Sequence, residues 1–223
     1  MMIILVRHGE ATHHTQRLTG GWTDSQLTEK GRAQIKAAAV KLAKDFAGRN
    51  CKLRILASDL QRASASAQII AEELGFKGEI EHCRFLREKN NGIAVGMTEE
   101  EAKKHFCKPA SEQELDHRNY PGGETRNEFY RRNVHGLWHY ADVDKENLLI
   151  VAHKGTIQNI IFRWLGMDMQ QVAAFNYSVD VQPASVTVLG INKWHEHAVF
   201  RLNDVSHLTQ GKGFGVFEFK YEK

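Results

Sequence analysis

The chain has 223 residues, 42% of them hydrophobic, so it can bury a substantial core and we expect one domain over residues 1–223. Thirty basic and 27 acidic residues give a formal net charge of +3, which is too even to indicate a nucleic-acid or membrane partner, yet suits an anionic substrate. Three widely spaced cysteines without a C-x-x-C pair argue against a disulfide framework or a thiolate zinc site and favour a cytoplasmic location.

Short apolar runs predict strands that are buried on both faces. They cover residues 2–6 (MIILV), 53–57 (LRILA) and 148–152 (LLIVA). The first run is followed at once by Arg7 and is too short for a signal sequence or a membrane span. We therefore expect it to form the first strand of a central sheet.

Amphipathic helices are predicted after the first two runs. A helix capped by Thr28 places apolar residues at helical spacing as far as Phe46. A second helix is expected to end at Gly75, and Ser58 and Gln61 fit the capping-box pattern at its start. In that pattern a hydroxyl and a later polar side chain satisfy each other's exposed backbone N–H groups.

The second half of the chain continues the alternation of strands and helices. Residues 85–123 lack a clear period, Thr125 and Glu128 fit another capping box, and a helix after His153 should stop at Gly166. Further strands are expected over residues 186–190, over 198–202, for which a position at the sheet edge is one option, and over 214–219, where apolar residues alternate only in part. The pattern predicts the α/β class, as a three-layer α/β/α sandwich with a mostly parallel central sheet.

Charged side chains follow the predicted strands at the edge where open α/β sheets bind ligands. They are Arg7 and His8 after the first strand, Arg62 after the second, and His153 with Lys154 after the third. Gly9 allows a close approach of the backbone, and the helix N-termini add positive dipole ends. Guanidinium and imidazole groups gathered in this way predict an anion site. Glu88 is the nearby carboxyl group suited to general acid catalysis.

These motifs in this order resemble the histidine phosphatase superfamily, also called phosphoglycerate mutase-like. The matching segments are Arg7–Glu10 (RHGE), Gly21–Asp24, Leu27–Gly31, Arg62, Leu86–Glu88, Pro121–Glu124 and His153. By this resemblance His8 forms a phosphohistidine, while Arg7, Arg62 and His153 hold the phosphoryl oxygens. Glu88 then acts first as an acid and afterwards as a base.

The resemblance also implies substrate-binding residues, namely His14, Gly20, Gly21 and Lys154. The sequence departs from the family pattern at Ala11, which replaces threonine or serine, and at His14, which replaces a phosphate-contacting asparagine. Lys154 replaces the first glycine after the second histidine. Because each position touches the phosphate site of the family, substrate choice or pH dependence is expected to differ.

The implied activity is metal-independent, cofactor-free hydrolysis of a small phosphorylated metabolite. Residues 89–106 form a short stretch, without the long insertion that phosphoglycerate mutases place over a bisphosphorylated intermediate. The alternatives are a phosphoglycerate mutase and a non-catalytic phosphate-binding module. His13–His14 and His195–His197 lack helical H-x-x-x-H spacing, so we expect no metal site. The sequence leaves open the substrate and the oligomeric state, a homo-oligomer included.

Overall fold

The computed structural model describes residues 1–49, 51–111 and 113–208 of the chain. The strands are β1 (Met2–Arg7), β2 (Leu53–Ala57), β3 (Ile80–His82), β4 (Asn147–Ala152), β5 (Val186–Ile191) and β6 (His197–Asp204). The helices are α1 (Thr12–Thr15), α2 (Glu29–Phe46), α3 (Gln61–Glu73), α4 (Glu99–Lys103), α5 (Arg126–Tyr140), α6 (Lys154–Trp164) and α7 (Met169–Ala174). Short 3₁₀ turns are η1 (Arg84–Leu86), η2 (Gly92–Ala94) and η3 (Ser206–Leu208).

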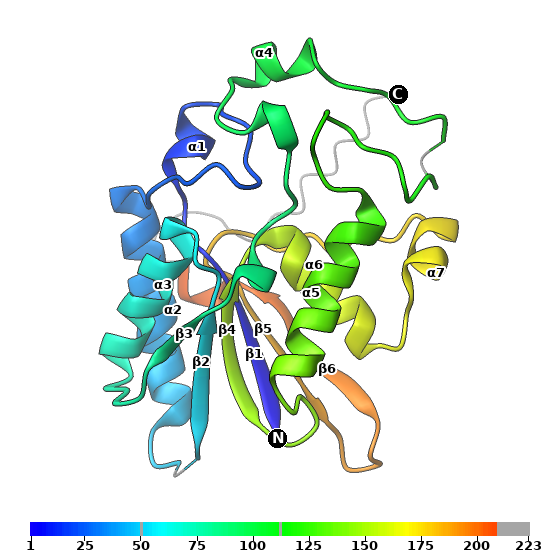
Figure 1. Ribbon diagram of the computed structural model, residues 1–223. Helices are drawn as coiled ribbons and strands as arrows, with labels where there is room; N and C mark the ends of the chain where they lie inside the picture. The colour runs from blue at the N-terminus through cyan, green and yellow to red at the C-terminus, as the bar shows by residue number, and fades with distance from the viewer. Residues whose placement is uncertain (50, 112, 209–223) are drawn as a thin grey trace, which may run out of the picture.

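Within the described residues the strands form one sheet of six, in the order β3-β2-β4-β1-β5-β6. The strands β1 to β4 run parallel, β5 pairs antiparallel with β1, and β6 pairs antiparallel with β5. The carboxyl ends of the parallel strands point toward α1 and α4 at the top of Figure 1. The mostly parallel sheet is confirmed, and the strand over residues 198–202 is indeed at the edge.

Strand β1 shows why the sheet is covered on both faces. Ile3 and Leu5 pack into one hydrophobic cluster with residues of α5 and α6, and Ile4 and Val6 pack into a second with residues of α2 and α3. Side chains that alternate along a strand point to opposite faces, so a continuous apolar run needs a helical layer on each side. Figure 1 shows the two helix pairs flanking the sheet, which confirms the three-layer architecture.

The helix starts agree with the capping predictions except at α3. Thr28 and Thr125 accept hydrogen bonds from the backbone of Gly31 and Glu128, as expected for caps. The prediction for Ser58 is wrong, because α3 begins at Gln61 after an N-cap at Leu60 that makes no side-chain bond. The first turn of α3 is instead bound by a distant carboxylate, since Asp24 Oδ1 accepts from the Gln61 N–H at 2.8 Å.

The expected irregular stretch contains only short elements in its described part, namely η1, η2 and α4. Together with α1 it lies above the carboxyl ends of the strands in Figure 1. The weak strand prediction over residues 214–219 lies outside the described residues. None of the helices in the described ranges has the length and apolar character needed to cross a membrane.

Candidate active site

The charged side chains predicted at the carboxyl edge of the sheet converge there. Arg7 ends β1, His8 follows it, Arg62 is the second residue of α3, and His153 is the N-cap of α6. The rings of His8 and His153 have their centroids 5.1 Å apart. His8, Arg62 and His153 are 3%, 1% and 1% exposed, so this polar cluster is enclosed by protein.

The tautomer of His8 is determined by its two contacts. Its Nδ1 lies 2.7 Å from the Gly9 carbonyl oxygen, which accepts only, so Nδ1 carries the proton. Arg62 Nε donates to His8 Nε2 at 3.3 Å, which requires a free lone pair on Nε2. Burial, followed by the nearby Arg62, holds the pKa of His8 well below its ordinary value. His8 is therefore a neutral imidazole with its lone pair on Nε2.

Arg62 is held by backbone carbonyls. Its two terminal nitrogens donate to the carbonyl oxygens of Thr23 and Gly21 at 2.6 and 2.7 Å. Burial lowers the pKa of Arg62 to about 10, so it stays a cation at neutral pH. Among the described residues no carboxylate lies within ion-pair distance of Arg62 or Arg7. The positive charge at the site is thus available to an anion.

Some buried polar atoms of this cluster lack a partner within the described part of the chain. Arg7 donates through Nη1 to the Val181 carbonyl at 2.7 Å, whereas its Nε has no hydrogen-bond acceptor. His153 Nε2 lies 2.8 Å from Ser58 Oγ, and its Nδ1 is likewise unsatisfied. Buried polar atoms are normally paired, so these two mark places where a ligand oxygen can bind.

His14 presents a donor to the same region. The Ala11 N–H donates to His14 Nδ1 at 3.1 Å, so the neutral ring carries its proton on Nε2. That nitrogen lies 3.4 Å from Arg7 Nη2, another donor, and an acceptor between the two would satisfy both. Partial burial, followed by the charge of Arg7, lowers the pKa of His14 to about 4. Its neighbour His13 is bonded to Ser25 Oγ at 2.7 Å, and burial lowers the pKa of His13 to about 3.

The carboxylate of Glu88 is oriented by two backbone amides. Oε2 accepts from the Gly155 N–H and Oε1 from the Lys89 N–H, both at 2.9 Å. A Cβ on Gly155 would overlap Glu88 Oε1, so glycine is needed for this approach. Glu88 does not pair with Arg87 on the surface, because Arg87 forms a bidentate ion pair with Asp59.

The three glycines and the lysine that were also expected at the site have different neighbours. Gly9 does allow a close approach, but to the backbone of Gly31, which a Cβ would overlap. Gly21 has φ +65° and packs against the Lys89 carbonyl, while Gly20 lies beside the His13 ring. The Lys154 ammonium forms an exposed ion pair with Asp180 at 2.8 Å. Contact of Gly20, Gly21 and Lys154 with a substrate stays a prediction.

The family model described as histidine phosphatase superfamily, branch 1, matches residues 3–204. The chain belongs to this superfamily. Phosphoglycerate mutase-like protein 4 of Arabidopsis thaliana is 32% identical over 222 residues, covering 96% of this chain and 91% of the relative. A 2,3-bisphosphoglycerate-dependent phosphoglycerate mutase of Brucella ovis is 30% identical over 183 residues, covering 76% and 84%. The α-ribazole phosphatase structure from Shigella flexneri matches with a TM-score of 0.73 at 21% identity, covering 92% and 97%, and so supports the fold.

Sequence reasoning missed several residues that contact the groups of this site. Ser58 contacts His153 rather than capping a helix, and Trp22 and Arg132 both hydrogen-bond the Glu88 carbonyl. Trp22 gave a signal through its place in the Gly21–Asp24 motif. Arg132 gave none, because it lies among other charged residues on an amphipathic helix. No group of three or more His, Cys, Asp or Glu side chains in the described ranges is arranged to hold a metal ion.

Proposed function

We propose that this protein hydrolyses a small phosphomonoester through a phosphohistidine at His8, without a metal ion. The observation that carries the proposal is a neutral imidazole with an unprotonated Nε2, bonded to one guanidinium and close to a second. An imidazole must be neutral to attack phosphorus. The phosphoryl group in transit needs positive charge around its equatorial oxygens, and Arg7 and Arg62 supply it.

In the first step the Arg62 Nε–H leaves His8 Nε2 and donates to a phosphoryl oxygen of the substrate instead. The freed lone pair of His8 Nε2 attacks the phosphorus atom as the bond to the ester oxygen breaks. Arg7, Arg62, the His14 Nε2–H and His153 hold the phosphoryl oxygens. For His153 the donor is Nδ1–H, because the Ser58 hydroxyl can donate to Nε2 and leave Nδ1 protonated. For this step Glu88 must carry a proton, which it gives to the departing alkoxide, and it becomes the carboxylate that the Gly155 and Lys89 amides bind. The alcohol then leaves.

In the second step water attacks the phosphohistidine. The Glu88 carboxylate accepts a proton from the water as the new P–O bond forms, and the P–N bond breaks. The electron pair of that bond returns to His8 Nε2, and inorganic phosphate leaves the site. The hydrogen bond from His8 Nδ1–H to Gly9 keeps the ring in one orientation through both steps.

The test is hydrolysis of p-nitrophenyl phosphate by the wild type and by His8→Ala, with chelator present, from acid to neutral pH. We expect turnover in the wild type and none in the variant. Brief incubation with labelled phosphoester should leave an acid-labile label on the wild type alone. Turnover in His8→Ala, or activity that disappears with chelator, would overturn the proposal.

A second candidate function is that of a phosphoglycerate mutase, which is favoured by the similarity to the mutase of Brucella ovis. The same phosphohistidine would then return its phosphoryl group to another hydroxyl of a retained substrate instead of passing it to water. Incubation with 3-phosphoglycerate and a 2,3-bisphosphoglycerate primer distinguishes the two functions. Primer-dependent formation of 2-phosphoglycerate faster than release of phosphate would favour the mutase.

A further inference from the structure

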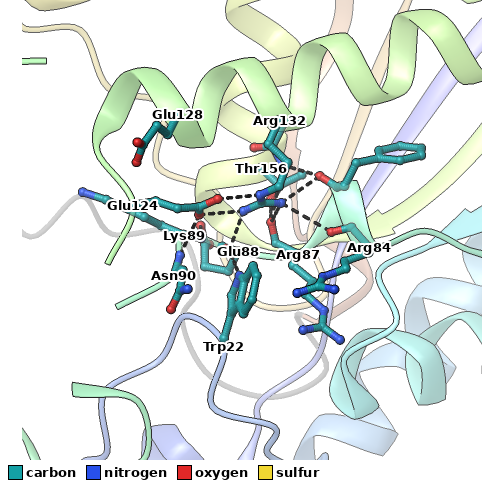
Figure 2. Close-up of polar contacts among 12 residues, drawn as sticks. Trp22, Arg84, Arg87, Glu88, Lys89, Asn90, Glu124, Glu128, Arg132 and Thr156 are labelled. Atoms are coloured by element: carbon teal, nitrogen blue, oxygen red, sulfur yellow. Dashed lines mark hydrogen bonds and ion pairs between the residues drawn. The ribbon is translucent and has the colours of Figure 1, made fainter. Parts of the chain in front are cut away.

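A second set of side chains, next to the site described above, holds the backbone on both sides of Glu88 (Figure 2). Arg132, on α5, donates to the carbonyl oxygens of Phe85, Arg87 and Glu88, each at 3.0 Å. Its guanidinium also forms a bidentate ion pair with Glu124, at 2.6 and 2.8 Å. Glu124 in turn accepts from the Asn90 N–H at 2.8 Å. One ion pair thus binds the chain before and after Glu88.

Trp22 adds a second donor to the same point. Its Nε1–H donates to the Glu88 carbonyl at 2.7 Å, so this oxygen accepts from both Trp22 and Arg132. The guanidinium groups stacked near the indole are those of Arg84, Arg87 and Arg132, at 5.2, 4.9 and 5.6 Å from the ring centroid. A carbonyl oxygen has two lone pairs, and both are therefore used. The backbone of Glu88 has little freedom to move.

The same tryptophan connects this region to the phosphate site. Arg62 donates to the carbonyls of Gly21 and Thr23, on either side of Trp22. The turn that carries Trp22 is thereby held by Arg62 through its backbone and bound to Glu88 through its indole. A displacement of Glu88 relative to Arg62 must break hydrogen bonds in this turn. Effective proton transfer depends on such relative placement.

From these contacts we infer that Arg132, Glu124 and Trp22 are positioning residues for the proton transfer by Glu88, an inference that rests on the proposed function. Glu124 compensates the charge of Arg132, and the side chains of this ion pair are 15% and 20% exposed. The guanidinium therefore acts through its geometry, by binding carbonyl groups in a fixed plane. A lysine at position 132 keeps the charge and loses that geometry.

The experiment compares Arg132→Lys and Trp22→Phe with the wild type on a good leaving group, p-nitrophenyl phosphate, and a poor one, glycerol 2-phosphate. Trp22→Phe keeps an aromatic ring and removes the indole donor together with the five-membered ring that carries it. We expect kcat on glycerol 2-phosphate to fall about 10-fold and kcat on p-nitrophenyl phosphate to fall less than about 3-fold, since only the alkoxide needs a proton. Arg131→Lys, an exposed neighbour on the same helix, is the matched control.

Each variant is also made with Glu88→Gln. If Arg132 and Trp22 act through the acid, they should cause no further loss once the acid is gone. Equal losses on both esters, or a further loss in the Glu88→Gln background, would overturn the inference and leave the proposed function intact. Absence of hydrolysis in the wild type would overturn the proposed function and the inference with it. Trp22→Phe suffices for the comparison should Arg132→Lys not fold.

Discussion

Arg62 and Arg132 make the same kind of contact in two neighbouring regions, because both donate hydrogen bonds to backbone carbonyl groups. Each directs its guanidinium at the carbonyl oxygens of a tight turn, Arg62 at Gly21 and Thr23, and Arg132 at Phe85, Arg87 and Glu88. The difference is the counterion. Arg132 forms an ion pair with Glu124. Within the described residues Arg62 has no carboxylate partner, and its Nε donates to the neutral ring of His8 instead.

This difference separates a binding charge from a positioning charge. A buried cation without a hydrogen-bonded carboxylate is costly, and 1% exposure makes Arg62 such a cation. We interpret that cost as the requirement of a site that must attract an anion. Arg132 has its charge compensated, so what it offers is a fixed set of donors. The two arginines should therefore respond differently to the same substitution.

The largest effect is expected for Arg62→Lys. Lysine lacks the fork that binds two carbonyls and the Nε that faces His8, so we expect kcat/KM to fall about 10²- to 10³-fold. The loss should be equal for esters with good and poor leaving groups, because the phosphoryl charge is common to both. Arg32→Lys, an exposed arginine of α2, is the control. A loss confined to esters with poor leaving groups would mean that Arg62 acts on proton transfer, as Arg132 does, and not on the phosphoryl group.

A smaller effect is expected for Gly155→Ala, whose methyl group would meet the Glu88 carboxyl and the Phe129 ring while the hydrogen-bond partners of Arg132 stay in place. The added methyl group would overlap Glu88 Oε1 and displace the carboxyl from the Gly155 N–H. We expect about a 10- to 100-fold loss of kcat for glycerol 2-phosphate and a much smaller loss for p-nitrophenyl phosphate. Steady-state kinetics on both esters provide the measurement. An unchanged ratio between the two esters would argue against Glu88 as the acid.

The smallest effect concerns the dependence of stability on pH. It arises in the region of Arg62, because the histidines with lowered pKa values lie there. His13 has a pKa of about 3 when folded and an ordinary value of 6.5, so below pH 6.5 the unfolded chain binds the extra proton. The free energy of unfolding should therefore decrease as pH falls, by about 2 kcal/mol from pH 6.5 to 4.5 for this group. Urea denaturation of wild type and His13→Gln measures it. Parallel decreases in both proteins would contradict the assignment.

The capping boxes show where sequence reasoning succeeds and where it fails. Thr125 and Glu128 are bonded as the pattern predicts, because the groups that cap each other lie within one turn. Ser58 fits the same pattern, yet its hydroxyl lies against His153, 95 residues away. Asp24 binds the start of α3 in its place. A local pattern cannot indicate that a distant group competes for the same side chain.

By itself the sequence determined the strands 2–6, 53–57 and 148–152 to within a residue at either end, the helix that follows each, and the place of Arg7, His8, Arg62 and His153 at the carboxyl edge of the sheet. Periodicity and strand ends are local properties, so they can be read from the chain. The cytoplasmic location and the single domain stay predictions. Only the tertiary structure decided the tautomer of His8, the counterion of Arg132 and the two amides that orient Glu88. The contact between Glu88 and the adjacent Lys89 amide is local, but the others depend on the fold. The His8 ring, for example, faces Gly9 on one side and Arg62, 54 residues away, on the other.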